Sequence, residues 1–323
     1  MGDSSTCLLA ECRPATTRYP PAAPPLLQWL MIGDSISLQV ATHEGFAAEA
    51  ARRGWQVVHS HGNACGVLRA ARCLDSWLEE ESDGGGARWD VISFNFGLHD
   101  LSWTAERVEP DAYATAVRAL AERLRRAAPR ASLLWATTTP VPRQMMPKAG
   151  LASVSRCLMA ASHTNNNRAN KNGSSVDASC RATHSSADPP VYNAAAACAL
   201  RGWDAAKATP SGSTKHYHPS ATCLNFSAPD PPLISGDVNL YLAVRDRCGS
   251  FHLRCSNVQR TSDIHFEAEG VTLLAKTYLD AMSELMARGG PRQGSGPRSG
   301  QESRVSRRKG ALESTTSAHR AAS

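Results

Sequence analysis

The chain lacks several features that would assign it to a common class of protein. No run of about 18 apolar residues occurs in its 323 residues, which excludes a transmembrane helix. The N-terminus has no basic region followed by an apolar core, so no cleavable signal peptide is evident. No Cys-x-x-Cys pair or His/Cys cluster occurs, so we predict no metal site. Aromatic residues are sparse at 6%, but 42% of the residues are hydrophobic, enough for a sizeable core.

Positive charge is in excess, but its position argues against a nucleic-acid partner. Lys and Arg number 35 against 29 Asp and Glu, a net charge of +6. Much of the excess lies in a Gly/Ser/Pro-rich tail over residues 290–323, at Arg292, Arg298, Arg304, Arg307, Arg308 and Lys309. Such a composition buries too little apolar surface to fold, so we expect a disordered basic tail. No aromatic residue of the tail could stack on bases, and we predict no nucleic-acid partner.

Cysteines are numerous and allow two interpretations. The chain has 10 of them, and Cys248 and Cys255, which bracket a short loop, are the best candidates for a disulfide. The alternative is a set of reduced, mostly buried thiols, as in a cytosolic enzyme. Spacing does not decide between the two, so the chain could be cytoplasmic or secreted. The oligomeric state also stays open.

Strands and helices alternate along much of the chain. Residues 1–25 are polar and proline-rich and predict a disordered leader. Short continuous apolar runs predict strands over 29–32, 55–60, 89–96, 132–138 and 238–244. Helical periodicity predicts helices over 36–53, 67–81 and 111–127. This alternation is typical of an α/β protein with a parallel sheet covered by helices on both faces.

The alternation is interrupted in the middle of the chain. We expect two long surface insertions, at about 143–188 and 202–235, on either side of a helix over 191–200. An amphipathic segment over 270–286 predicts the last helix. The sequence therefore predicts one domain over residues 26–289, with a leader before it and the basic tail after it.

The tetrad Gly33-Asp34-Ser35-Ile36 lies where a predicted strand turns into a predicted helix. A serine at such a turn is exposed, and its N–H lies at the positive end of the helix dipole. This position suits a nucleophile whose attack generates an oxyanion. The same tripeptide at Gly2-Asp3-Ser4 has neither a strand before it nor an apolar helix after it, so we give it no catalytic role.

Further polar blocks fall at the ends of other predicted strands. Residues 63–66 follow the second strand, residues 97–100 end the third, and residues 263–266 lie between the fifth strand and the last helix. Ligands of parallel α/β sheets bind beyond the carboxyl ends of the strands. We therefore expect these blocks and Ser35 to meet at one edge of the sheet.

The residue types in these blocks predict acyl transfer. Ser35 would attack an ester carbonyl, His265 would take and return the proton, and Asp263 would orient the imidazole. The oxyanion would be bound by the backbone N–H groups of Ser35 and Gly66 and by the His99 side chain. Each has a structural alternative: a helix N-cap for Ser35, a turn glycine for Gly66 and a hydrogen-bonding role for His99.

Four neighbouring polar residues would support the site. Asp34 is expected to brace the turn, and Asp100 to anchor its loop through hydrogen bonds. Asn63 is a weaker candidate from the loop before Gly66. Asn95 would either line the site or satisfy backbone groups at a strand end. This chemistry needs no metal and no cofactor.

These ordered blocks resemble the SGNH, or GDSL, hydrolase family of esterases and lipases. The similarity is greatest to the branch with a Gly-Leu-His-Asp motif, here residues 97–100. It extends over 89–101, 134–142, 192–194 and 263–266 with Gly270. The matching segments cover a little over half of the chain, in the right order.

The resemblance implies a three-layer α/β/α, flavodoxin-like fold with a five-stranded parallel sheet. It also implies metal-independent hydrolysis of small acyl esters, often O-acetyl groups of carbohydrates. On the matching positions, Ser35 corresponds to the family nucleophile, Gly66 to the glycine of the second block and His265 to the general base.

The chain departs from the family pattern at two positions. His99 stands where many members have an Asn donor, and Ser262 stands three residues before the histidine, where many have the acid. Asp263 is the nearest carboxylate. The missing acid at position 262 supports one alternative to an esterase, a catalytically weak SGNH-fold protein that binds its ligand. A second alternative is an acyltransferase that uses the same residues.

Overall fold

The computed structural model describes residues 11–17, 26–78, 89–101, 108–142, 189–201, 229, 232–248, 255–260 and 263–290. All of these residues belong to one unit, Met1–Pro291. The predicted first insertion at 143–188, most of the second at 202–235, and all of the predicted tail except Gly290 lie outside the described residues.

The sheet contains five parallel strands, in the order β3-β2-β4-β5-β6, and one short antiparallel strand beside β3 at its edge. The parallel strands span Leu27–Gly33 (β2), Trp55–His59 (β3), Val91–Asn95 (β4), Ser132–Ala136 (β5) and Gly236–Val238 (β6). The chain starts in the middle of the sheet, turns to β3 on one side and then crosses to β4 on the other. This is the doubly wound, flavodoxin-like order, whose crevice lies where the winding reverses. The predicted α/β class with five parallel strands is confirmed.

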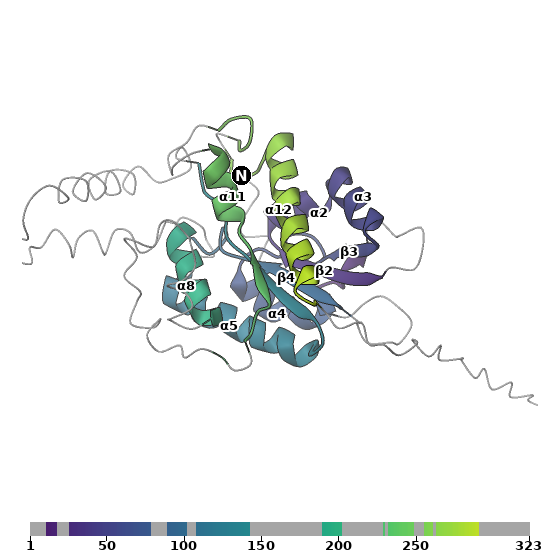
Figure 1. The fold of residues 1–323 in the computed structure, drawn as a ribbon. Helices are drawn as coiled ribbons and strands as arrows, with labels where there is room; N and C mark the ends of the chain where they lie inside the picture. The colour runs from purple at the N-terminus through teal and green to yellow at the C-terminus, as the bar shows by residue number, and fades with distance from the viewer. Residues whose placement is uncertain are drawn as a thin grey trace, which may run out of the picture. The chain divides into compact units, whose positions relative to one another are not determined.

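Two layers of helices cover the sheet (Figure 1). One layer contains α2, α3, α11 and α12, which span Ser35–Ala41, Glu44–Arg52, Leu240–Cys248 and Ala268–Ala287. The other contains α4, α5 and α8, which span Val67–Leu78, Pro110–Ala127 and Pro189–Arg201. Within the described ranges, none of these helices has the length and apolarity that a bilayer crossing requires.

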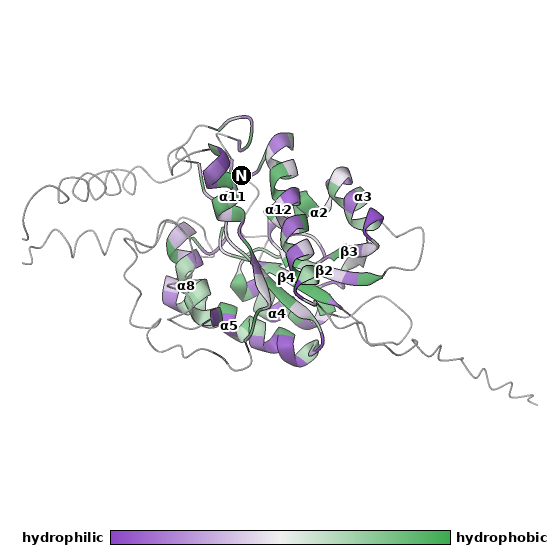
Figure 2. Cartoon of the chain, in the orientation of Figure 1, coloured by the Kyte–Doolittle hydropathy of each residue, from purple (hydrophilic) through white to green (hydrophobic). Residues whose placement is uncertain are grey.

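Burial explains why the strands are continuous apolar runs. All five residues of β4 are buried, and hydrophobic colour covers β2 and β4 in Figure 2. On the α12 side of the sheet, the Trp29 ring packs against Phe46, Trp55 and Tyr278 at centroid distances of 5.7, 6.4 and 6.0 Å. Strands buried on both faces have no solvent side on which polar residues could alternate.

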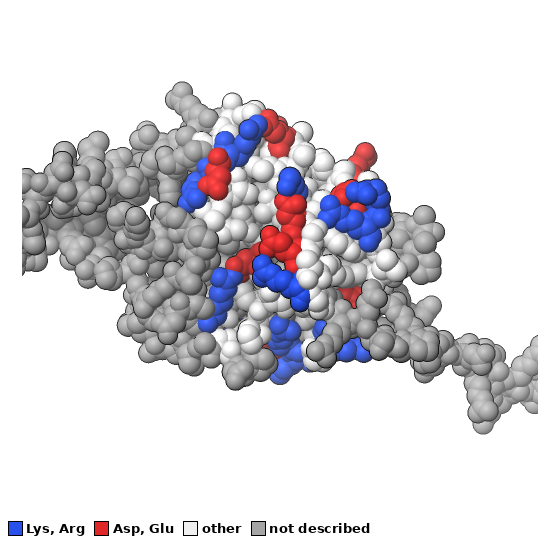
Figure 3. Space-filling model, viewed as in Figure 1, with Lys and Arg blue, Asp and Glu red and all other residues white. Residues whose placement is uncertain are grey.

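The outer face of the α12 layer carries charges of both signs side by side (Figure 3). Along α12, Lys276 pairs with Asp280 at 2.5 Å and Arg288 with Glu284 at 3.1 Å, both at i,i+4 spacing. Such pairs support a solvated helix face by a few tenths of a kcal/mol each. The helix thus buries one face and pairs its charges on the other.

One predicted strand is wrong. Residues 238–244 were expected to be extended, but only Gly236–Val238 pairs with β5, and α11 begins at Leu240. The Asn239 side chain accepts a hydrogen bond from the Leu242 N–H at 3.1 Å and so caps the new helix. A short apolar run is compatible with a strand or a helix, and here the cap at Asn239 favours the helix.

The predicted helix over 36–53 is divided into α2 and α3. The His43 ring accepts a hydrogen bond from the Phe46 N–H at 3.3 Å and caps α3. The Thr42 hydroxyl donates to the Leu38 carbonyl at 2.8 Å at the end of α2. Thr42 therefore ends α2 and His43 begins α3, where the sequence predicted one continuous helix.

Part of the predicted leader is ordered. The strand β1, Thr16–Thr17, pairs antiparallel with the outer edge of β3, and Cys12 forms a disulfide with Cys73 of α4. The expectation of disorder over residues 1–25 is therefore wrong for residues 11–17. The disulfide links residues 61 positions apart and so lowers the conformational entropy of the unfolded chain. The prediction of disorder, which considered composition alone, did not include this effect.

The candidate disulfide between Cys248 and Cys255 is present. Every cysteine among the described residues is disulfide-bonded. For these residues, the alternative of reduced thiols is wrong.

Candidate active site

Ser35 lies at the junction of β2 and α2, at the carboxyl edge of the sheet. Asp34 has an extended backbone and caps the helix, with its carboxyl group accepting from the Ile36 N–H at 3.0 Å. Gly33 has no room for a side chain, because an added Cβ would collide with the Ser37 hydroxyl. The glycine and the cap together give a tight turn that leaves Ser35 partly exposed.

The structure brings Ser35, His265 and Asp263 together, although 230 residues separate the first two. The His265 Nε2 atom lies 2.8 Å from the Ser35 Oγ atom, and its Nδ1 atom lies 2.8 Å from both carboxyl oxygens of Asp263. A carboxylate can only accept, so Nδ1 carries the proton and Nε2 is left to accept from the serine hydroxyl. The arrangement forms a continuous path for a proton from Ser35.

The acid of this group is ionised. Burial by itself would raise the pKa of Asp263, but the hydrogen bonds from the His265 ring and from the N–H groups of Ile264 and His265 outweigh it, so the pKa is lowered. The Arg260 guanidinium lies 3.8 Å from the same carboxylate. Asp263 precedes the histidine by two residues, and Ser262, at the position of the usual family acid, lies outside the described residues.

The loop before α4 brings Gly66 to the same edge. The Ala64 N–H donates to the Gly33 carbonyl at 2.9 Å, which ties this loop to the turn before Ser35. A Cβ on Gly66 would lie 2.5 Å from an Asp100 carboxyl oxygen, so only glycine fits. Asp100 is buried and accepts from the Val67 N–H at 3.1 Å, and it thereby anchors the loop to the end of β4.

His99 lies against Asn63, and their contact fixes the tautomer of the ring. The Asn63 amide oxygen accepts from the Cys65 N–H at 2.8 Å, so its nitrogen faces the His99 Nε2 atom at 3.3 Å and donates to it. The proton of the neutral ring therefore lies on Nδ1. Burial, with smaller electrostatic contributions from His265 and Arg69, lowers the pKa of His99 to about 4, which keeps the ring neutral at pH 7.

Asp34 and Asn95 form a buried polar pair next to Ser35. Burial raises the pKa of Asp34 to about 7, against the lowering effect of the backbone N–H groups of Ile36 and Ser37. In one orientation, the Asn95 amide nitrogen donates to the two carboxyl oxygens of Asp34 at 2.9 and 3.2 Å. In the other orientation, the amide nitrogen donates to the carbonyl groups of Ala136, the last residue of β5, and Thr137 at 3.3 and 3.4 Å. A protonated Asp34 can then donate to the amide oxygen.

A carboxamide also fixes the loop after β5. The Asn193 side chain accepts from the Thr138 N–H at 2.7 Å and donates to the Thr138 carbonyl at 2.9 Å. The Thr138 hydroxyl donates to the Phe96 carbonyl at 2.7 Å and fills the space beside Gly97, whose φ is +136°. These contacts connect the Gly-Leu-His-Asp motif to the segment around Asn193.

Sequence reasoning missed two glutamines of the site. Gln39 on α2 donates to the carbonyl of Phe266 and accepts from its N–H. Gln259 donates to the carbonyl of Ile264, so both glutamines bind the backbone on either side of His265. The only signal for Gln39 was its place four residues after Ser35, on the same face of a predicted helix. No group of three or more His, Cys, Asp or Glu within the described ranges could hold a metal ion.

Comparisons with known proteins give only distant structural similarities. No family model matches the chain, and no curated protein matches it. A solved acetylxylan esterase, Axe2 of Geobacillus stearothermophilus, is 13% identical over 79% of this chain and 94% of its own, with a TM-score of 0.42. A structure described as a GDSL-like lipase from Parabacteroides merdae is 12% identical over 82% and 99%, with a TM-score of 0.43. A Bacteroides fragilis structure described as an acylhydrolase is 11% identical over 83% and 92%, with a TM-score of 0.40. Similarity this low carries no argument about the activity of this chain.

Proposed function

We propose that this chain is a serine esterase of the SGNH/GDSL type, which hydrolyses carboxylic esters. The observation that carries the proposal is the contact of Ser35, His265 and Asp263, with 2.8 Å at each step, beside the N-terminus of α2. A nucleophile, a base and an acid in series are what acyl transfer by serine requires. Their place at the carboxyl edge of a doubly wound sheet agrees with where such folds bind ligands.

The reaction proceeds in two half-reactions. As the Ser35 oxygen attacks the ester carbonyl, its proton passes to the His265 Nε2 atom, and the ionised Asp263 stabilises the resulting imidazolium. The tetrahedral intermediate collapses, and the alcohol leaves with the proton from Nε2. Water then attacks the acyl-serine, giving its proton to His265, and the carboxylic acid leaves as Ser35 recovers its hydrogen.

Developing charge on the carbonyl oxygen is met by fixed donors. We assign these to the backbone N–H groups of Ser35 and Gly66, with the Nδ1–H of His99 as a side-chain donor. The first N–H groups of a helix have no partner within the helix, and the dipole favours negative charge there. Removing one such donor typically costs about 3 kcal/mol of transition-state stabilisation.

The substrate class that we propose is small acyl esters, including O-acetyl groups of carbohydrates. Support for it comes from the resemblance of the motif blocks to SGNH esterases. The acyltransferase alternative uses the same three residues and differs only in the acceptor of the second half-reaction. The products of the reaction therefore distinguish an acyltransferase from an esterase, whereas the residues of the site do not.

A fluorophosphonate probe tests the proposal, because it reacts covalently with an activated serine. We expect labelling of the wild-type protein, loss of labelling in Ser35→Ala, and full labelling in Ser4→Ala, which alters the other Gly-Asp-Ser tripeptide. Folded protein that never labels would overturn the proposal and favour a binding protein. Ser35→Ala protein that still labels would overturn it by showing that another serine is the activated one. Hydrolysis of p-nitrophenyl acetate with and without an added alcohol then distinguishes hydrolysis from transfer.

A further inference from the structure

We propose that Gln39 is a positioning residue, which holds the loop carrying the general base in register with the helix carrying the nucleophile. This inference rests on the proposed function and deepens it. Ser35 and His265 are 230 residues apart in the sequence. Contacts other than their own hydrogen bond are therefore needed to hold the two side chains at this distance.

Gln39 lies one helical turn after Ser35, on the same face of α2. Its side-chain oxygen accepts from the Phe266 N–H at 3.2 Å, and its side-chain nitrogen lies 3.4 Å from the Phe266 carbonyl, to which it donates. Phe266 directly follows His265. One carboxamide therefore joins the helix of the nucleophile to the residue next to the base, over 227 positions of sequence.

Phe266 is a fixed point of the loop. Its side chain is 1% exposed, and it forms a β-bridge with Gln259. The Gln259 side chain donates to the Pro140 carbonyl at 2.8 Å and to the Ile264 carbonyl at 3.1 Å, which ties the loop to the segment after β5. The loop thus contacts the segment after β5 through Gln259 and contacts α2 through Gln39.

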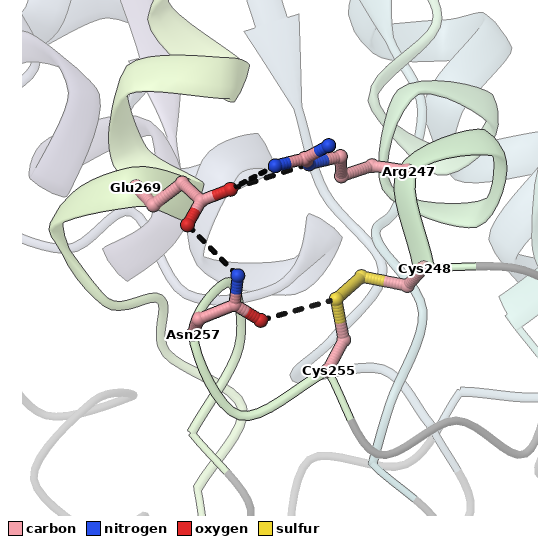
Figure 4. Close-up of a disulfide and its surroundings, with 5 residues drawn as sticks. All are labelled: Arg247, Cys248, Cys255, Asn257 and Glu269. Atoms are coloured by element: carbon pink, nitrogen blue, oxygen red, sulfur yellow. Dashed lines mark hydrogen bonds and ion pairs between the residues drawn. A yellow bond between two sulfur atoms is a disulfide. The ribbon is translucent and has the colours of Figure 1, made fainter.

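The start of this loop is anchored separately, at the end of α11 (Figure 4). Cys255 is disulfide-bonded to Cys248, and the Asn257 side chain donates to Glu269 at 2.8 Å. Arg247 donates to the other carboxyl oxygen of Glu269 at 2.5 Å. These contacts fix the beginning of the loop to α11 and α12, whereas the end that carries His265 is fixed to α2 by Gln39.

A carboxamide is suited to this role because it presents a donor and an acceptor as a peptide group does. Asn193 makes the same pair of hydrogen bonds with the backbone of Thr138, on the other side of the sheet. An apolar side chain of equal length would leave the Phe266 N–H and carbonyl without these partners. Displacing a catalytic group by about 1 Å can cost about 100-fold in rate.

The test compares three variants with the wild-type enzyme. Gln39→Met keeps the length of the side chain and removes both hydrogen bonds, and Gln39→Glu keeps the acceptor for the Phe266 N–H. Ser283→Ala is the matched control, because it removes a hydrogen bond from Arg53 at 2.6 Å that joins α3 to α12. For each, kcat and KM for p-nitrophenyl acetate, the fluorophosphonate labelling rate and the thermal unfolding midpoint are measured.

We expect Gln39→Met to lower kcat and the labelling rate at least about tenfold, with KM within about twofold of wild type. Gln39→Glu should recover only part of the lost rate, because it keeps the acceptor for the Phe266 N–H but loses the donor to the Phe266 carbonyl. Ser283→Ala should keep the wild-type kcat while its unfolding midpoint falls about as much as that of Gln39→Met. A kcat for Gln39→Met within twofold of wild type, or a fall matched by Ser283→Ala, would overturn the inference. Wild-type protein that neither labels nor hydrolyses would instead overturn the proposed function.

Discussion

Asp34 carries a carboxyl group that is fully buried directly before the candidate nucleophile, and its replacement by asparagine makes a sharp prediction. Asparagine has the same shape and is an equally good helix N-cap, so its oxygen can still accept from the Ile36 N–H. Its nitrogen can donate to the Asn95 amide oxygen, as a protonated Asp34 would. Asp34→Asn therefore resembles the neutral carboxyl group at every pH.

The magnitude follows from the position of the pKa. A pKa raised by burial from the ordinary value of 3.8 to about 7 corresponds to about 4 kcal/mol against the ionised form in the folded state. Because the folded protein binds this proton more tightly than the unfolded chain, the stabilisation is complete below about pH 4 and is lost as the pH rises towards 7. The variant has no such group and no such loss.

The assay is urea unfolding of wild type and Asp34→Asn between pH 5 and pH 8.5. Other titrating groups are common to both proteins and cancel in the difference between their free energies of unfolding. We expect that difference to move in favour of the variant by about 3 kcal/mol between pH 5 and pH 8. A difference that does not change with pH, or one that moves in favour of wild type, would refute the reasoning.

Three further variants test other contacts of the structure. Asp263→Asn should lower kcat by about 100-fold or more, because the imidazole loses the carboxylate that orients it; a fall below about tenfold would remove Asp263 from the catalytic group. Gly66→Ala should lower kcat, and it should lower the free energy of unfolding by about 1–3 kcal/mol, because the new Cβ would lie 2.5 Å from a carboxyl oxygen of the buried Asp100. Wild-type kinetics and wild-type urea unfolding would contradict this. Replacing Cys248 and Cys255 by serine should cost about 2 kcal/mol in urea unfolding, given the sequence separation of 7, and an unchanged midpoint would contradict it.

Much of the fold could be predicted because its elements are locally specified. The helix expected over 111–127 is α5, and its recurring apolar residues Tyr113, Val117, Leu120 and Leu124 are all buried. The first four strands were predictable as apolar runs between turns. Since parallel strands present their carboxyl ends at one edge, the same reasoning expected Ser35 and the block around His265 to lie together.

The remaining features depend on contacts that a sequence does not display. The run over 238–244 was ambiguous, and a side-chain cap at Asn239 decided for a helix. Residues 11–17 are held by a disulfide between Cys12 and Cys73 and by the pairing of β1 with β3, and no spacing rule pairs these two cysteines. Gln39 has no motif, because its partner is the backbone of a residue far along the chain.

The central claim is that His265 activates Ser35, and peptide mass spectrometry of the fluorophosphonate adduct tests it most directly. The account predicts that the adduct lies on Ser35 in the wild-type protein and is lost in folded His265→Ala, although the serine itself is still present. An adduct on another serine, or undiminished labelling of Ser35 without the imidazole, would contradict it.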